Sequence, residues 1–219
     1  MRMGRFVTLW LACVAGLMAM VIGVNLAVDP YGVFGSGDHP RPRALAQPYL
    51  AKTYMVERIQ PGTVLMGSSR VEIGLDPASP AWPAEQRPVF NFGLGGASAF
   101  VDLRFLQHTF AVARPRRVAI GIGLEDCIIT ADTRSAARRR HLDQNFQERL
   151  SVTRSGKPNP RQWRARIRDA ATALLSLTAF GDSLATLLDR DSRGRAHMTP
   201  LGYNDGGDLR GGGGCQVAQ

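Results

Sequence analysis

The chain begins with one long apolar segment, and shorter apolar runs separated by turn residues follow it. Phe6 to Val28 contains no charged side chain, and about 20 apolar residues are enough to cross a bilayer as a helix. A signal-peptide core is shorter, about 7–15 residues, and no convincing cleavage site precedes Asp29. The pattern therefore favours an uncleaved, single-pass membrane anchor over a cleaved signal peptide. Arg2 and Arg5 precede the span, so the positive-inside rule puts the N-terminus in the cytoplasm and the main domain on the extracytoplasmic (periplasmic) side.

Three short apolar runs end in glycine and polar residues, which is typical of buried parallel strands. They are residues 63–66, 89–92 and 118–122. Ser98 is a good N-cap for a helix running to about Ala113, between the second and third runs. Strand, helix and strand with such short links predict a right-handed βαβ unit. The sequence therefore predicts an α/β fold, a flavodoxin-like three-layer α/β/α domain with an incomplete parallel sheet.

Turn residues and composition also set the expected division of the chain. A short helix is expected at residues 49–59, mostly loop at 70–88, and one or two helices at 161–189. Glycine-rich tails behave as flexible coil, and we expect the chain to be truncated or frameshifted near Gly206. The alternative is a short variant with a disordered tail. The four parts are the cytoplasmic N-terminus and anchor, a connector with a short helix, the partial α/β domain and the glycine-rich tail: 1–28, 29–62, 63–205 and 206–219.

Composition and net charge limit the classes of binding partner that we expect. The chain has 219 residues, 44% of them hydrophobic and 21% charged, which indicates a globular protein. Its net charge of +9 is compatible with nucleic acid, anionic lipid or acidic polysaccharide, or simply with solvated helix faces. No nucleic-acid-binding motif accompanies the charge, so the expected partners are the membrane and an anionic envelope polysaccharide. The three cysteines have no metal-binding or redox spacing, and we expect neither a metal nor a cofactor.

The candidate chemistry lies on the three loops that follow the predicted strands. Ser69 is on the first loop, Asn91 and Gly95 are on the second, and Glu125 and Asp126 are on the third. Because the carboxyl ends of parallel strands meet at one edge of a sheet, these residues are expected to lie close together. A glycine before the serine pair allows the sharp turn that presents a nucleophilic serine at this edge.

The order of these blocks resembles the SGNH (GDSL-like) hydrolase superfamily. Residues 67–70, Gly-Ser-Ser-Arg, stand at the position of its Gly-Asp-Ser block, and residues 91–96 and 123–126 stand at the second and third blocks. The resemblance covers roughly residues 64–126. Membrane-anchored extracytoplasmic branches of the superfamily handle O-acyl groups on cell-envelope polymers and transfer D-alanyl groups to teichoic acids. The resemblance therefore implies an acyl-ester hydrolase or O-acyltransferase that acts on an envelope polymer.

The same resemblance assigns roles to single residues. Ser69 is the implied nucleophile, and Gly95 and Asn91 of the second block are the implied oxyanion residues, with the glycine lending a backbone N–H. Glu125 stands where the family has an asparagine donor, although a carboxylate only accepts hydrogen bonds. The general base of the family is a histidine three residues after an aspartate, and no histidine of this chain has that spacing: His39, His108, His141 and His197.

Non-catalytic alternatives remain open at each position. Ser69 could cap the helix after the first strand, and Gly95 could belong to an ordinary strand-to-helix turn. Asp126 could cap a strand end and Glu125 could pair with an arginine. The literal signature Gly-Asp-Ser-Leu at residues 181–184 falls in a helical pattern, where we expect a helix cap or kink. The alternative function is a catalytically inactive, membrane-anchored binding or scaffold protein.

Overall fold

A three-stranded parallel sheet organises the fold. The computed structural model describes residues 2–35, 42–123, 146–188 and 196–207. Strand β1 (Thr63–Gly67) lies at the centre, between β2 (Val89–Asn91) and β3 (Arg117–Gly121). Both neighbours run parallel to β1. The strand order β2-β1-β3, with helices between successive strands, confirms the predicted α/β class.

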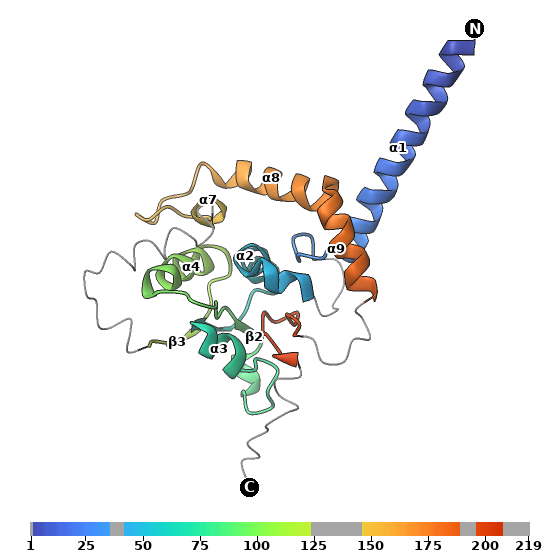
Figure 1. Ribbon diagram of the computed structural model, residues 1–219. Coiled ribbons are helices and arrows are strands. Elements are labelled where there is room, and N and C mark those ends of the chain that lie inside the picture. Colours follow the sequence, from blue (N-terminus) through green and yellow to red (C-terminus); the bar gives the residue numbers. More distant parts are fainter. Residues whose placement is uncertain (1, 36–41, 124–145, 189–195, 208–219) are drawn as a thin grey trace.

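Helices α2 (Pro48–Ile59) and α4 (Ala99–Val112) cover one face of the sheet (Figure 1). Val64 of β1 is in register with Phe90 of β2 and Val118 of β3, so the three side chains point to the same face. They pack with apolar side chains of both helices in the main hydrophobic core. Burial of this apolar surface is the main favourable contribution to folding.

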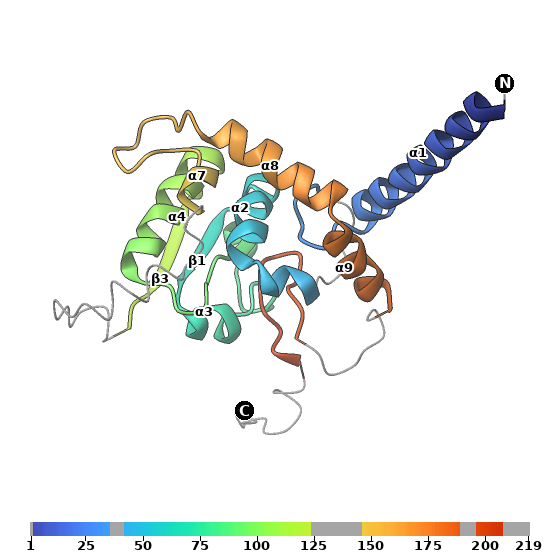
Figure 2. The same cartoon turned by 45° about the horizontal axis from the view of Figure 1, so that its top comes forward.

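A short helix, α3 (Ser69–Gly74), lies against the opposite face (Figure 2). Leu65 and Val89 point to this side and form a small core with Val71 of α3 and the half-buried Trp82. The sheet is therefore the middle of three layers, as the flavodoxin-like prediction requires.

The outer strand β3 is incompletely covered. Ile120 is 46% exposed and the following Ile122 is 64% exposed, although parallel strands are normally buried on both faces. Within the described ranges, β3 pairs with β1 alone. The described sheet is thus consistent with the predicted incomplete flavodoxin-like fold.

Helix α1 (Arg2–Val28) projects away from the rest of the protein (Figures 1 and 2). An 18-residue window within Met3–Val28 has a mean hydropathy of 2.3 and is not buried, whereas Asn25 and Val28 near the end of the helix are buried. By length and composition, this helix is apolar enough to cross a membrane.

Two further helices, α8 (Gln162–Leu175) and α9 (Leu177–Leu188), meet at a bend of 62°. Taken together, they also satisfy the length and composition expected of a membrane span. Both pack against α1 (Figure 1). The remaining described helical segments are short. They are Pro42–Ala46, Ala84–Gln86 and α7 (Phe146–Arg149), which is a single turn before α8.

The helices partly match the sequence-based expectations. The helix after Ser98 is present, whereas α3 occupies residues that we expected to be mostly loop. Residues 181–184 lie inside α9, so their helical setting is confirmed, but they form neither a cap nor a kink. The bend lies at Ser176, whose Oγ accepts a hydrogen bond from the backbone N–H of Thr178 over 3.1 Å. Ser183 is instead buried and donates to Asn25 Oδ1 over 2.9 Å.

Candidate functional site

The turn after β1 places Ser69 at the edge of the sheet. Gly67 has a φ of +143°, and a Cβ atom there would lie 2.7 Å from the carbonyl oxygen of Gly121, so this position requires glycine. Ser68 occupies the N-cap position of α3, and its carbonyl accepts from the N–H of Val71 over 3.0 Å. Ser69 is therefore the first helical residue rather than the cap, and its side chain is exposed.

The loop after β2 runs beside this turn. The backbone N–H of Leu94 donates to the carbonyl of Gly67 over 2.8 Å, which ties the two loops together. Gly95, the next residue, is exposed. Within the described residues, neither Ser69 nor Gly95 has a hydrogen bond assigned to its backbone N–H. Two unused backbone donors on adjoining loops are what a developing oxyanion needs.

A buried lysine connects α2 to both loops. Lys52 is fully buried, donates a short hydrogen bond to the carbonyl of Gly93, and has its Nζ atom 3.7 Å from Glu72 Oε1 of α3. Burial lowers the pKa of Lys52 to about 8, and the neighbouring Glu72 carboxylate opposes this decrease. The pair therefore holds the second loop and α3 in fixed positions around Ser69. Sequence reasoning did not identify either residue.

Asn91 also holds the two loops together. Its side-chain Nδ2 donates to the carbonyls of Val71 and Leu75 over 2.7 and 2.8 Å, and its Oδ1 accepts from the N–H of Gly93 over 2.8 Å. The whole side chain is buried. A role for Asn91 in the oxyanion site stays a prediction, but here its amide hydrogens are already used to position α3.

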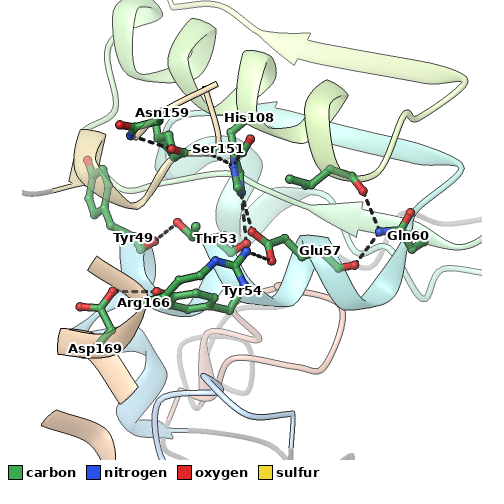
Figure 3. Close-up of polar contacts among 12 residues, drawn as sticks. Tyr49, Thr53, Tyr54, Glu57, Gln60, His108, Ser151, Asn159, Arg166 and Asp169 are labelled. Carbon is green, nitrogen blue, oxygen red and sulfur yellow. Dashed lines mark hydrogen bonds and ion pairs between the residues drawn. The ribbon is translucent and has the colours of Figure 1, made fainter. Parts of the chain in front are cut away.

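His108 does not have a free ring nitrogen for base catalysis (Figure 3). The backbone N–H of Ser151 donates to Nδ1 over 3.0 Å, so Nε2 carries the proton and lies 3.3 Å from the carbonyl oxygen of Thr53. The ring is fully buried, and burial lowers its pKa to about 4. His108 is thus a neutral structural contact between α4, α2 and the segment after α7.

This buried histidine is expected to make the protein less stable in acid. Its pKa is near 6.5 in the unfolded chain and about 4 in the folded protein, so between these values only the unfolded chain binds the proton. The free energy of unfolding therefore falls as the pH decreases, by up to about 3.5 kcal/mol at about 1.4 kcal/mol per pH unit. Glu57, 3.8 Å from Nε2 and paired with Arg166, faces the same ring.

Urea unfolding of the wild type and of His108→Gln between pH 7 and pH 4 tests this expectation. The amide cannot titrate, so the variant should lose stability less steeply as the pH falls. Equal slopes for the two proteins would contradict the assignment, whatever the stability of the variant at neutral pH.

A second histidine, His197, lies on a small hairpin that ends at Asp205. Asp205 accepts from the backbone N–H of His197 over 2.7 Å, and its other carboxylate oxygen lies 3.5 Å from His197 Nδ1. The hairpin packs against α3, because the N–H of Asn204 donates to the carbonyl of Glu72 over 3.2 Å. His197 is half-buried. A carboxylate close to an imidazole is one element of the arrangement of a general base.

Sequence reasoning missed this pair because it looked for an aspartate three residues before the histidine. The available signal was the Pro-x-Gly turn at residues 200–202 between two polar segments. The N–H of Gly202 closes this turn by donating to the carbonyl of Thr199 over 2.9 Å. The turn brings His197 and Asp205 opposite each other across the hairpin.

Glu125 and Asp126 lie outside the described residues, as does the tail after residue 207. In the part of the chain that is described, no three His, Cys, Asp or Glu side chains gather as metal ligands would.

Comparison of the chain with models of known families, with curated proteins and with solved structures found no match.

Proposed function

We propose that the protein is a membrane-anchored, SGNH-like serine acyl-ester hydrolase or O-acyltransferase that acts on a cell-envelope polymer. One observation carries the proposal: Ser69 is exposed at the carboxyl end of β1, and within the described residues no hydrogen bond is assigned to its backbone N–H or to that of Gly95 on the adjoining loop. Open α/β sheets bind ligands at this edge. The proposal needs no cofactor.

The proposed reaction is acyl transfer in two steps. Ser69 Oγ attacks the carbonyl carbon of the ester, and the N–H groups of Ser69 and Gly95 stabilise the negative charge on the carbonyl oxygen. His197, oriented by Asp205, is the candidate to accept the hydroxyl proton and to return it to the departing alcohol. Water or an acceptor hydroxyl then attacks the acyl-serine, which releases the acid or forms the new ester and restores Ser69.

The proposed location follows from the charge around the anchor. Arg2 and Arg5 flank the N-terminal side of α1, which supports a cytoplasmic N-terminus and an extracytoplasmic, periplasmic domain. The net charge of +9 supports attraction to an anionic polysaccharide at the outer surface.

A fluorophosphonate probe tests the nucleophile. We expect the folded wild type to form a covalent adduct, and Ser69→Ala to abolish it because the attacking oxygen is removed. Ser68→Ala is the matched control, since it changes the adjacent hydroxyl and should keep the adduct. Labelling that survives in Ser69→Ala, or is lost only in Ser68→Ala, would contradict the role of Ser69.

The second candidate is a binding or scaffold protein without catalysis. It is favoured by the absence of any hydrogen bond between Ser69 and a histidine among the described residues. His197→Ala separates the two functions. In an enzyme, loss of the base should slow labelling about 10²–10⁴-fold, whereas a scaffold would not label in either form.

A further inference from the structure

The outer end of α1 is attached to the bend between α8 and α9, here called the elbow. Asn25 of α1 is fully buried, and its Nδ2 donates to the carbonyl of Leu174 over 2.9 Å and approaches that of Ser176 at 3.4 Å. On the other side, Ser183 Oγ donates to Asn25 Oδ1. These bonds satisfy carbonyl groups at the point where the helical hydrogen bonds of α8 are interrupted. They therefore hold the elbow against α1 at the position of Asn25.

The level of the elbow coincides with the outer boundary of the predicted membrane span. About 20 residues cross the hydrocarbon core, and 20 residues counted from Phe6 end at Asn25. The elbow side chains Leu175 and Leu177 line an apolar groove against residues of α1 between Val14 and Ile22. At about 1.5 Å per residue, these α1 positions lie below that boundary. The elbow therefore reaches into the depth of the span.

The exposed side of α9 continues this apolar surface. Leu177, Leu184 and Leu188 are 76%, 42% and 84% exposed, and their spacing of seven and four residues puts them on one helix face. On α8, the exposed Trp163 lies under the guanidinium group of Arg164, 5.3 Å from the ring centroid. Tryptophan and arginine are typical residues of a membrane–water interface.

From this continuity we infer that the elbow and the leucine face of α9 insert into the outer leaflet of the bilayer that α1 crosses. The occupant of this face is lipid acyl chains, and the arginine-rich start of α8 lies at the head groups. The domain is then held in one orientation at the membrane surface, because α1 and the elbow give two fixed points of attachment. In both views of the fold, the elbow lies at the base of α1 (Figures 1 and 2).

Fluorescence quenching in lipid vesicles tests this inference on the full chain. Single-cysteine variants with the other cysteines changed to serine carry an environment-sensitive dye at Leu177→Cys or Leu184→Cys. Leu75→Cys is the matched control, because Leu75 is also an exposed leucine, 41% exposed, and directly follows α3. We expect brominated acyl chains to reduce the fluorescence at positions 177 and 184 and not at 75, where aqueous iodide should quench instead.

The inference rests on α1 crossing the bilayer, and the native Cys13 reports on that separately. Quenching of a dye on Cys13 by brominated lipid, together with iodide quenching at 177 and 184, would overturn the insertion of the elbow while keeping the anchor. Protection of 177 and 184 from both quenchers would also overturn it, since another protein surface would then cover α9. Iodide quenching at Cys13 would instead show that α1 itself does not span the membrane.

Discussion

Replacing Lys52 by methionine is expected to lower the free energy of unfolding by about 3–5 kcal/mol, the usual effect of removing one partner of a buried ion pair. The substitution leaves Glu72, which is only 7% exposed, without its cation. It also removes the hydrogen bond to the carbonyl of Gly93. Urea unfolding of the full chain in detergent, followed by the fluorescence of Trp82 in the smaller core, measures the change.

The double variant Lys52→Met with Glu72→Gln is the control for this effect. If the uncompensated charge is the main cause, neutralising it should recover most of the lost stability, because a neutral pair of similar volume removes the charge imbalance. A loss below about 1 kcal/mol in the single variant would place the lysine in the range of a solvent-exposed pair. That result would contradict its burial between α2, α3 and the loop after β2.

The sheet and its longer helices could be predicted because their patterns are local. Each strand is a short run with a glycine at its end or within two residues after it, as residues 63–67 illustrate, and α4 begins immediately after Ser98 with apolar residues at helical spacing. Helix α3 could not be predicted in this way. It has six residues, includes two β-branched side chains and ends in Gly74, so its intrinsic helix propensity is low. Tertiary hydrogen bonds from Asn91 and the N–H of Asn204 hold it instead.

The support around Ser69 depends on contacts that are distant in sequence. Lys52 and Gly93 are 41 positions apart, and nothing in the sequence near Lys52 distinguishes it from a solvent-exposed lysine. Ser69 itself could be proposed from the sequence, because the glycine turn after a buried strand is a local signal. The pairing of His197 with Asp205 required recognition of the turn between them as a hairpin, which the spacing rule of the resembled family did not include.

Replacing Asn91 by aspartate should distinguish its structural contacts from a direct part in catalysis. The carboxylate has nearly the shape of the amide, but it puts a negatively charged oxygen against the carbonyls of Val71 and Leu75. The carbonyl of Leu75 loses the Asn91 donor, whereas that of Val71 keeps the backbone N–H of Leu75 at 3.2 Å. Because each buried unsatisfied group costs about 1–3 kcal/mol, we expect the free energy of unfolding to fall by about 3 kcal/mol or more at neutral pH. Urea unfolding measures this loss.

The pH dependence of the Asn91→Asp variant gives the sharper result. Burial raises the pKa of the introduced carboxyl, and in its protonated form this group regains one donor. The stability deficit relative to wild type should therefore shrink as the pH falls, whereas Asn91→Ala, which cannot titrate, should keep a constant deficit. If Asn91 were a free donor to the oxyanion, both variants would lose probe labelling but keep wild-type stability. Equal stability of all three proteins would thus contradict the structural role and favour a direct role of Asn91 in binding the oxyanion.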